Sequence, residues 1–181
     1  MSYRTDSIRH FDLFIPGSLF NLILYELHQD INPQFSIHGL DHWRRVAWNA
    51  QRLMEDVDVH KRLNIDKTIV YHFAYLHDSC RINDGHDIDH GVRAAERVID
   101  WWAKGWVKLT QGQALTLATA CQLHNYAHQV NDPTIACCLD ADRLDLGRCG
   151  IICNPDRLSL PKSHNWVDGC LPELIRNPIA V

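Results

Sequence analysis

A histidine and an aspartate lie side by side at the end of an apolar segment, in the stretch YLHDSCR at residues 75–81. The preceding residues have the spacing of a buried helix, which places His77 and Asp78 about 100° apart around its axis, on either side of one point. An uncompensated buried carboxylate costs several kcal/mol, so a counter-charge for Asp78 must come from elsewhere in the chain.

A second carboxylate interrupts an apolar helical face in the stretch CCLDADRLDLGRC at residues 137–149. Asp142 lies on the same stripe as Cys138 and Leu139, one helical turn further along. Like Asp78, Asp142 would be a buried carboxylate without a counter-charge. One cation between the two carboxylates would compensate both of them.

The two other aspartates of this stretch have a simpler explanation. Asp140 precedes Arg143 by three residues, and Asp145 precedes Arg148 by three. Opposite charges at this spacing form ion pairs on the surface of a helix. We therefore expect both pairs to be solvated and to have no part in a site.

Histidine side chains could complete the ligand set. In HGLDHWRRV, residues 38–46, His42 flanks the apolar stripe of a helix on the same side as Arg45. With His77 it would give two neutral imidazoles beside two carboxylates, which suit a divalent ion with open positions for water. Such mixed nitrogen and oxygen ligands favour Mn, Fe, Ni, Co, Zn or, less well, Mg.

Two further histidines lie on apolar helical stripes. His90 aligns with Ala94 and Val98, and His124 aligns with Leu117 among other apolar residues. Each could bind a second metal, could recognise a substrate, or could belong to the core. The spacing alone leaves these three alternatives open.

Helices must position these residues, because helical spacing runs through almost the whole chain and no segment has the alternation of a strand. Asp66 and Thr110 have the residue types of N-caps, and Pro133 suits a first helical turn. We expect helices at residues 18–29, 39–57, 66–80, 87–103, 111–128 and 133–148. The prediction is a single all-α domain over residues 1–181, with buried central helices.

The segment after Cys149 has a different character, because four prolines divide it. They leave room only for short helical turns in a tail at about residues 150–181. We expect this irregular, proline-rich tail to drape over the domain or to pack on a partner.

The composition limits the classes of function. The 181 residues are 46% apolar, which is typical of a globular protein, and the net charge is −4 with no basic run. This charge argues against a surface for duplex nucleic acid but not against a small anionic ligand. No signal sequence or membrane span is evident, and seven scattered cysteines without a CxxC pair are typical of reduced thiols. We expect a cytoplasmic protein, either a monomer or a homodimer.

The order of these motifs resembles that of the HD-domain metal-dependent phosphohydrolase superfamily. The match consists of HGLDHWRRV, of LHD with its histidine 35 residues after His42, and of DADRLDLGR with its second aspartate 64 residues after Asp78. It spans roughly residues 37–148. The resemblance implies an all-α helical bundle with a metal between its central helices. By residue match, the implied ligands are His42, His77, Asp78 and Asp142.

The resemblance also implies a reaction. Some members of this superfamily carry additional histidines and bind two metals, and His90 and His124 lie in similar segments. The chain lacks the GYP element of the cyclic-di-GMP branch. We expect a metal-activated water to hydrolyse a nucleotide or other small phosphoester, with Asp78 as a ligand that also orients the water or takes its proton. Four arginines are candidates to hold phosphate oxygens: Arg45, Arg81, Arg93 and Arg143.

Two other functions stay open at this point. A minority branch of the superfamily, which includes myo-inositol oxygenase, uses a similar cluster of histidines and aspartates for di-iron oxygen chemistry. That function would need both His90 and His124 as ligands, and iron in the purified protein. The chain could also be a sensor module that binds a nucleotide without turning it over, which a nucleotide-dependent rise in melting temperature without turnover would indicate.

Overall fold

The computed structural model describes residues 21, 23, 36–55 and 63–164, and among these residues all the regular secondary structure is helical, with no strand. The all-α prediction is therefore confirmed for this part. Its main helices are α3 (Leu40–Glu55), α5 (Lys67–Leu76), α6 (His90–Ala103), α7 (Gln111–Leu123) and α8 (Pro133–Arg143). Three short turns follow, namely η2 (Leu146–Cys149), η3 (Pro155–Arg157) and α9 (Pro161–His164). The helix expected at residues 18–29 lies outside the described residues, except for 21 and 23.

The predicted starts of α5, α7 and α8 agree with the structure, whereas α6 begins at His90 rather than at residue 87. The side chain of Asp66 accepts backbone N–H bonds at the start of α5, and Thr110 forms a capping box with Gln113 at the start of α7. Asp132 caps α8 in the same way, and Pro133 occupies its first turn. These side chains satisfy N–H groups that have no partner within their own helix.

Three helices end earlier than their apolar spacing predicts: α8 stops at Arg143 and is followed by the separate turn η2, and α5 and α7 also stop early. α5 stops at Leu76 and α7 at Leu123, and in both cases the next residue is a histidine that serves as the C-cap. The ring of His77 donates to the carbonyl of Phe73, which also accepts the backbone N–H of His77. After this cap, Asp78, Ser79 and Cys80 lie in a turn and are all buried.

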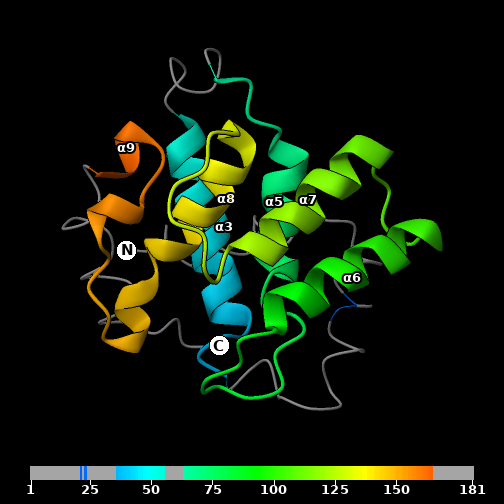
Figure 1. Cartoon of the computed structure of the whole chain (residues 1–181), viewed down its shortest axis with the longest axis horizontal. Helices are drawn as coiled ribbons and strands as arrows, with labels where there is room; N and C mark the ends of the chain where they lie inside the picture. The colour runs from blue at the N-terminus through cyan, green and yellow to red at the C-terminus, as the bar shows by residue number, and fades with distance from the viewer. Residues whose placement is uncertain (1–20, 22, 24–35, 56–62, 165–181) are drawn as a thin grey trace, which may run out of the picture.

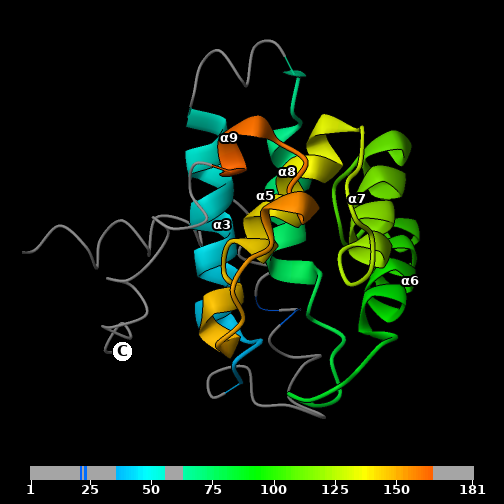
Figure 2. The same cartoon turned by 60° about the vertical axis from the view of Figure 1, so that its left-hand side comes forward.

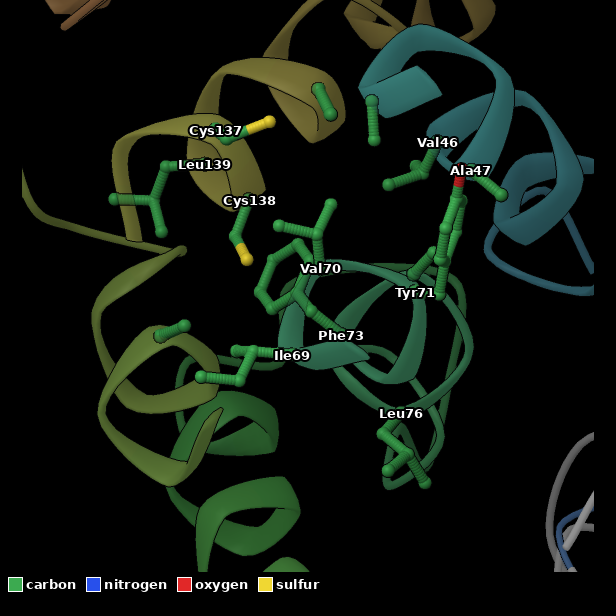
Figure 3. Packing of buried hydrophobic residues seen from close by; sticks show 14 of the residues in the cluster. Val46, Ala47, Ile69, Val70, Tyr71, Phe73, Leu76, Cys137, Cys138 and Leu139 are labelled. Carbon is green, nitrogen blue, oxygen red and sulfur yellow. The ribbon is translucent and has the colours of Figure 1, made fainter. Parts of the chain in front are cut away.

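Helix α5 lies at the centre of the domain. It contacts α3, α7 and α8, and α6 packs on α7 (Figures 1 and 2). Every residue of α5 from Ile69 to Leu76 is buried, which explains why its sequence is apolar on all sides. Figure 3 shows Val70 and Phe73 of α5 beside Cys138 of α8. None of the described helices has the length and apolar character needed to cross a membrane.

Three of the four residues in the aspartate–arginine pairs that we expected to be solvated are buried, so that prediction is wrong, although Arg148 does lie within ion-pair distance of Asp145, at 3.6 Å. Asp140 accepts the backbone N–H groups of Ser159 at 3.0 Å and Leu160 at 2.8 Å, and the hydroxyl of Ser163 at 2.7 Å. Asp145 is also fully buried. A helical spacing reveals which side chains are neighbours, but it does not reveal whether another segment covers them.

Arg143 also binds backbone rather than solvent. Its guanidinium donates to the carbonyl oxygens of Ala127, His128 and Arg157. Together with Asp140, it fastens the described part of the tail, residues 150–164, onto α8 (Figure 2). The tail therefore lies on the domain as short helical turns as far as residue 164, and its remainder lies outside the described residues.

Candidate metal centre

Six polar side chains converge at one point between the helices. His42 comes from α3, His77 and Asp78 follow α5, and His90 begins α6; His124 follows α7, and Asp142 lies in the last turn of α8. All six are buried. These are the six residues that the sequence predicts as certain or alternative ligands: His42, His77, Asp78, His90, His124 and Asp142. The structure brings all of them together.

One half of the cluster consists of two imidazoles and two carboxylates. The Nε2 atoms of His42 and His77 are 3.0 Å apart. Asp142 Oδ1 lies 3.3 Å from the first of these nitrogens and 3.6 Å from the second. Asp78 Oδ2 lies 3.4 Å and 3.6 Å from the same two nitrogens. Four ligand atoms thus surround one small volume.

The other half uses the second oxygen of the same aspartate. The Nε2 atoms of His90 and His124 are 2.8 Å apart. Asp78 Oδ1 lies 3.1 Å from the nitrogen of His90 and 3.5 Å from that of His124. Asp78 therefore faces a different pair of imidazoles with each oxygen, as a carboxylate that bridges two metal ions would do.

The hydrogen-bond partner of the outer nitrogen, Nδ1, shows which nitrogen of each histidine ring carries the proton. The Nδ1 atoms of three rings lie 2.7 Å from Asp145 Oδ2 for His42, 3.0 Å from the Phe73 carbonyl for His77 and 2.6 Å from the Cys121 carbonyl for His124. The Nδ1 atom of His90 contacts the carbonyl of Asp87. An oxygen acceptor requires an N–H, so in the neutral rings the unprotonated Nε2 atoms face inward, as they do in metal-binding histidines.

The short distances between the inward-facing Nε2 atoms are explained better by a metal ion bound between them than by direct contact of the two rings. In neutral rings, two Nε2 lone pairs 3.0 Å or 2.8 Å apart repel one another. Two metal–nitrogen bonds of about 2.1 Å at about a right angle would span about 3 Å, which is the separation found in both pairs. The donor set and its spacing therefore suit a divalent cation in each half of the cluster.

The carboxylates give the cluster a strong attraction for cations. Burial would raise the pKa of Asp78 and Asp142, but the surrounding imidazoles hold both well below their usual range. Burial would likewise lower the pKa of His42, but hydrogen bonds with Asp142, Asp145 and Asp78 raise it to about 9. A proton on His42 and a metal ion thus compete for the same carboxylates.

The cluster forms the base of a cavity of about 320 Å³. Asp78, His90, His124 and Asp142 line its inner end. Residues of η2 and the tail line its outer end, and Ile151 and Ile152 are among those exposed there. A small molecule can therefore reach the candidate ligands directly.

The four candidate phosphate-binding arginines have different positions. Arg45 lies behind the cluster, where its Nε donates to Asp145 Oδ1 at 2.7 Å, and Arg93 binds Asp87 and the carbonyl of Cys80; neither lines the cavity. Arg81 and Arg143 both line the cavity, and neither has a carboxylate within ion-pair distance among the described residues. The guanidinium of Arg143 is held by the carbonyls of Ala127, His128 and Arg157, so Arg81 is the one of the four that is better placed to meet a ligand.

Three residues of the site were not assigned to it from the sequence. His38 and Arg148 line the cavity, and Asp145 binds the outer nitrogen of His42. His38 precedes α3, where no helical spacing applies, although its position four residues before His42 is a usable signal. Asp145 and Arg148 looked like a surface pair.

Replacing Asp145 with asparagine should weaken metal binding. The amide oxygen could still accept from His42, but the negative charge that raises the basicity of the ring would be lost. We expect metal affinity to fall about 10-fold, and up to about 100-fold in Asp145→Ala. Competition titration against a fluorescent chelator would measure this. Asp41→Asn, at a half-exposed position on α3, is the matched control; equal affinities in Asp145→Asn and the control would contradict the assignment.

No protein-family model, no curated protein and no solved structure matches this chain. What can be said of its chemistry therefore comes from the residues themselves.

Proposed function

We propose that this protein is a metal-dependent phosphohydrolase of the HD type, acting on a nucleotide or other small phosphoester. The observation that carries the proposal is Asp78, whose two oxygens face two pairs of inward-pointing imidazoles at the base of an open cavity. A bound cation would compensate both carboxylates of this buried cluster, for which the described residues otherwise supply imidazoles and, at 3.9 Å from Asp78, the guanidinium of Arg148.

The chain supplies the ligands and the surroundings for this reaction. His42, His77, Asp78 and Asp142 would hold one divalent ion, and Asp78, His90 and His124 a second. A bound divalent ion lowers the pKa of a coordinated water and polarises a phosphoryl oxygen. Asp78 would also orient the attacking water, while Asp145 and the backbone carbonyls of Phe73 and Cys121 fix the imidazole rings.

One observation also suits an oxygenase. His90 and His124 both face Asp78, which is the arrangement that a di-iron centre of the HD type would require. Iron in the purified protein, with consumption of oxygen and no release of phosphate, would favour that function. A nucleotide-dependent rise in melting temperature without turnover would instead favour the sensor module.

The direct test is a panel of nucleotides and small phosphoesters, assayed for phosphate release with Mn, Co, Ni, Zn and Mg. We expect at least one substrate to be turned over with one of these metals. A chelator should abolish the activity, and the double variant His77→Ala, Asp78→Ala should lack it while staying helical. Activity that survives both treatments would come from elsewhere, and the proposal would fail.

Metal binding and hydrolysis should both weaken at acid pH. Imidazoles bind metal only when neutral, and despite its burial His42 has its pKa raised to about 9. Below that pH a proton competes with the metal, so the apparent affinity should rise from pH 5 to pH 9 and hydrolysis should be weak at pH 5. Calorimetric metal titrations in buffers of different ionisation enthalpy would measure the released protons. An affinity that is constant over this range would contradict the prediction.

A further inference from the structure

Arg81 lies on the cavity wall between two histidines. One of its terminal nitrogens is 3.1 Å from His38 Nε2 and 3.4 Å from the carbonyl of Gly85, and the other is 2.9 Å from His90 Nδ1. Since His90 Nδ1 already donates to the carbonyl of Asp87, it is a poor acceptor for Arg81, and the unprotonated His90 Nε2 lies further from the same nitrogen of Arg81, at 3.4 Å. The guanidinium thus has donors that the protein does not use.

The charge of Arg81 is also not balanced. Among the described residues, no carboxylate lies within ion-pair distance of it, and its Nε atom is buried without a hydrogen-bond partner. A guanidinium has five N–H donors in a planar fork that matches phosphate oxygens. An unbalanced guanidinium beside a metal cluster is therefore a site for an anion.

Arg148 reaches the same part of the cavity from η2. Its Nε donates to the Ile37 carbonyl at 3.0 Å and one terminal nitrogen to the Asp145 carbonyl at 3.1 Å, which fix the side chain. The other terminal nitrogen lies 3.1 Å from His38 Nδ1 and 3.9 Å from Asp78 Oδ2. The ring of His38 thus lies between two guanidinium groups.

His38 cannot satisfy all three of its neighbours. Its Nδ1 also lies 3.0 Å from Asp78 Oδ2, and a neutral imidazole has one N–H and one lone pair. If Nδ1 donates to Asp78 and Nε2 accepts from Arg81, the adjacent donor of Arg148 has no acceptor on the ring. We call His38, Arg81 and Arg148 the cationic arch; in any tautomer it keeps a free donor for a ligand.

The charge of the cavity as a whole supports an anionic ligand. Four arginines and two aspartates line it, although the chain carries a net charge of −4. Arg143 is occupied by carbonyl groups, but its charge still contributes to the local field. A positively charged cavity in a negatively charged chain attracts anions to that cavity rather than to the rest of the surface.

We propose that the cationic arch binds the phosphoryl oxygens of a small phosphomonoester beside the candidate metal ligands. This inference rests on the proposed phosphohydrolase function and defines its substrate class. A terminal phosphoryl group has three non-bridging oxygens and can meet the cluster and the arch together, whereas a diester has only two. The exposed side chains of Ile151 and Ile152 would contact the carbon part of the substrate, and about 320 Å³ suits a small molecule.

The test is the binding of inorganic phosphate by the Mn²⁺-loaded protein, measured by titration calorimetry. We expect Arg81→Gln to bind phosphate at least about 10-fold more weakly, with its metal content unchanged, and Arg81→Lys to recover part of the loss because it restores the charge but not the fork. Arg97→Gln is the matched control; this arginine of α6 stacks on Trp101 and does not line the cavity. It should bind phosphate like the parent protein.

Steady-state kinetics would distinguish the role of the cationic arch in substrate binding from the role of the metal ligands. With p-nitrophenyl phosphate as the probe, Arg81→Gln should raise KM at least about 10-fold, and bis-p-nitrophenyl phosphate should be a poorer substrate of the parent protein. Equal phosphate binding by the parent and Arg81→Gln would overturn the arch and leave the hydrolase proposal standing. A parent protein that prefers the diester would overturn the substrate class. One that neither binds phosphate nor hydrolyses any phosphoester would overturn the proposed function itself.

Discussion

Replacing Asp78 with alanine should abolish metal binding and lower phosphoester hydrolysis on the order of 10³-fold or more. Asp78 is the one carboxylate of the cluster that faces both pairs of imidazoles, so its loss removes a ligand from each half. The fold should survive, but the metal-free variant should be less stable than the metal-free parent, because His42 and the other imidazoles that hold the pKa of Asp78 low lose their counter-charge.

Metal analysis after dialysis, together with the hydrolysis assay, would measure this effect. Asp100→Ala is the matched control, since Asp100 is half-exposed on α6 and pairs only with Lys104 in the described structure. The control should keep full metal content and activity. If Asp78→Ala retained the metal stoichiometry of the parent at sub-micromolar free metal, Asp78 would not be a ligand.

Replacing Arg143 with alanine should lower the free energy of unfolding by about 3–5 kcal/mol. The substitution leaves three backbone carbonyls, held in part-buried hydrogen bonds, without their charged donor, and each group left unsatisfied costs up to about 1–3 kcal/mol, less whatever relaxation or water entry recovers. The tail should loosen from α8, and hydrolysis should fall as well because the tail forms the outer wall of the cavity.

Urea denaturation of the parent and the variant would give the difference in stability. Arg157→Ala is a close control, because Arg157 also lines the cavity but uses only its backbone carbonyl to hold Arg143. Its effect should stay below about 1 kcal/mol. Asp140→Ala, which removes the other anchor of the tail, should destabilise the protein as Arg143→Ala does. Equal stability of Arg143→Ala and the parent would show that the anchor is not needed.

The sequence contained enough to predict the members of the cluster. Asp78 and Asp142 interrupt apolar helical faces, and such faces become buried, so each carboxylate could be recognised as one that needs a cation. His90 and His124 could be found by the same reasoning. That Asp78 turns one oxygen toward each pair of imidazoles could not be predicted, because it depends on how the chain leaves α5 after His77.

The errors have a common physical origin. Asp140, Arg143 and Asp145 have the spacing of surface ion pairs, and only the packing of residues 150–164 on α8 buries two of them. Helical periodicity concerns neighbours within one helix, whereas burial depends on which other segment covers it. His38 was missed for a related reason, since it lies in a turn before α3 and has no helical face that could mark it.

The convergence of five helix ends on one point has a further consequence. The six ligand residues extend along the chain from His42 to Asp142, so an ion held among them would act as a cross-link between segments far apart in sequence. An ion that binds the folded form alone adds about 4 kcal/mol to the free energy of unfolding when its free concentration is 1,000 times its Kd. Loss of any one docked helix would release the ion. Metal retention would therefore report the integrity of the whole tertiary structure, in addition to the state of the site.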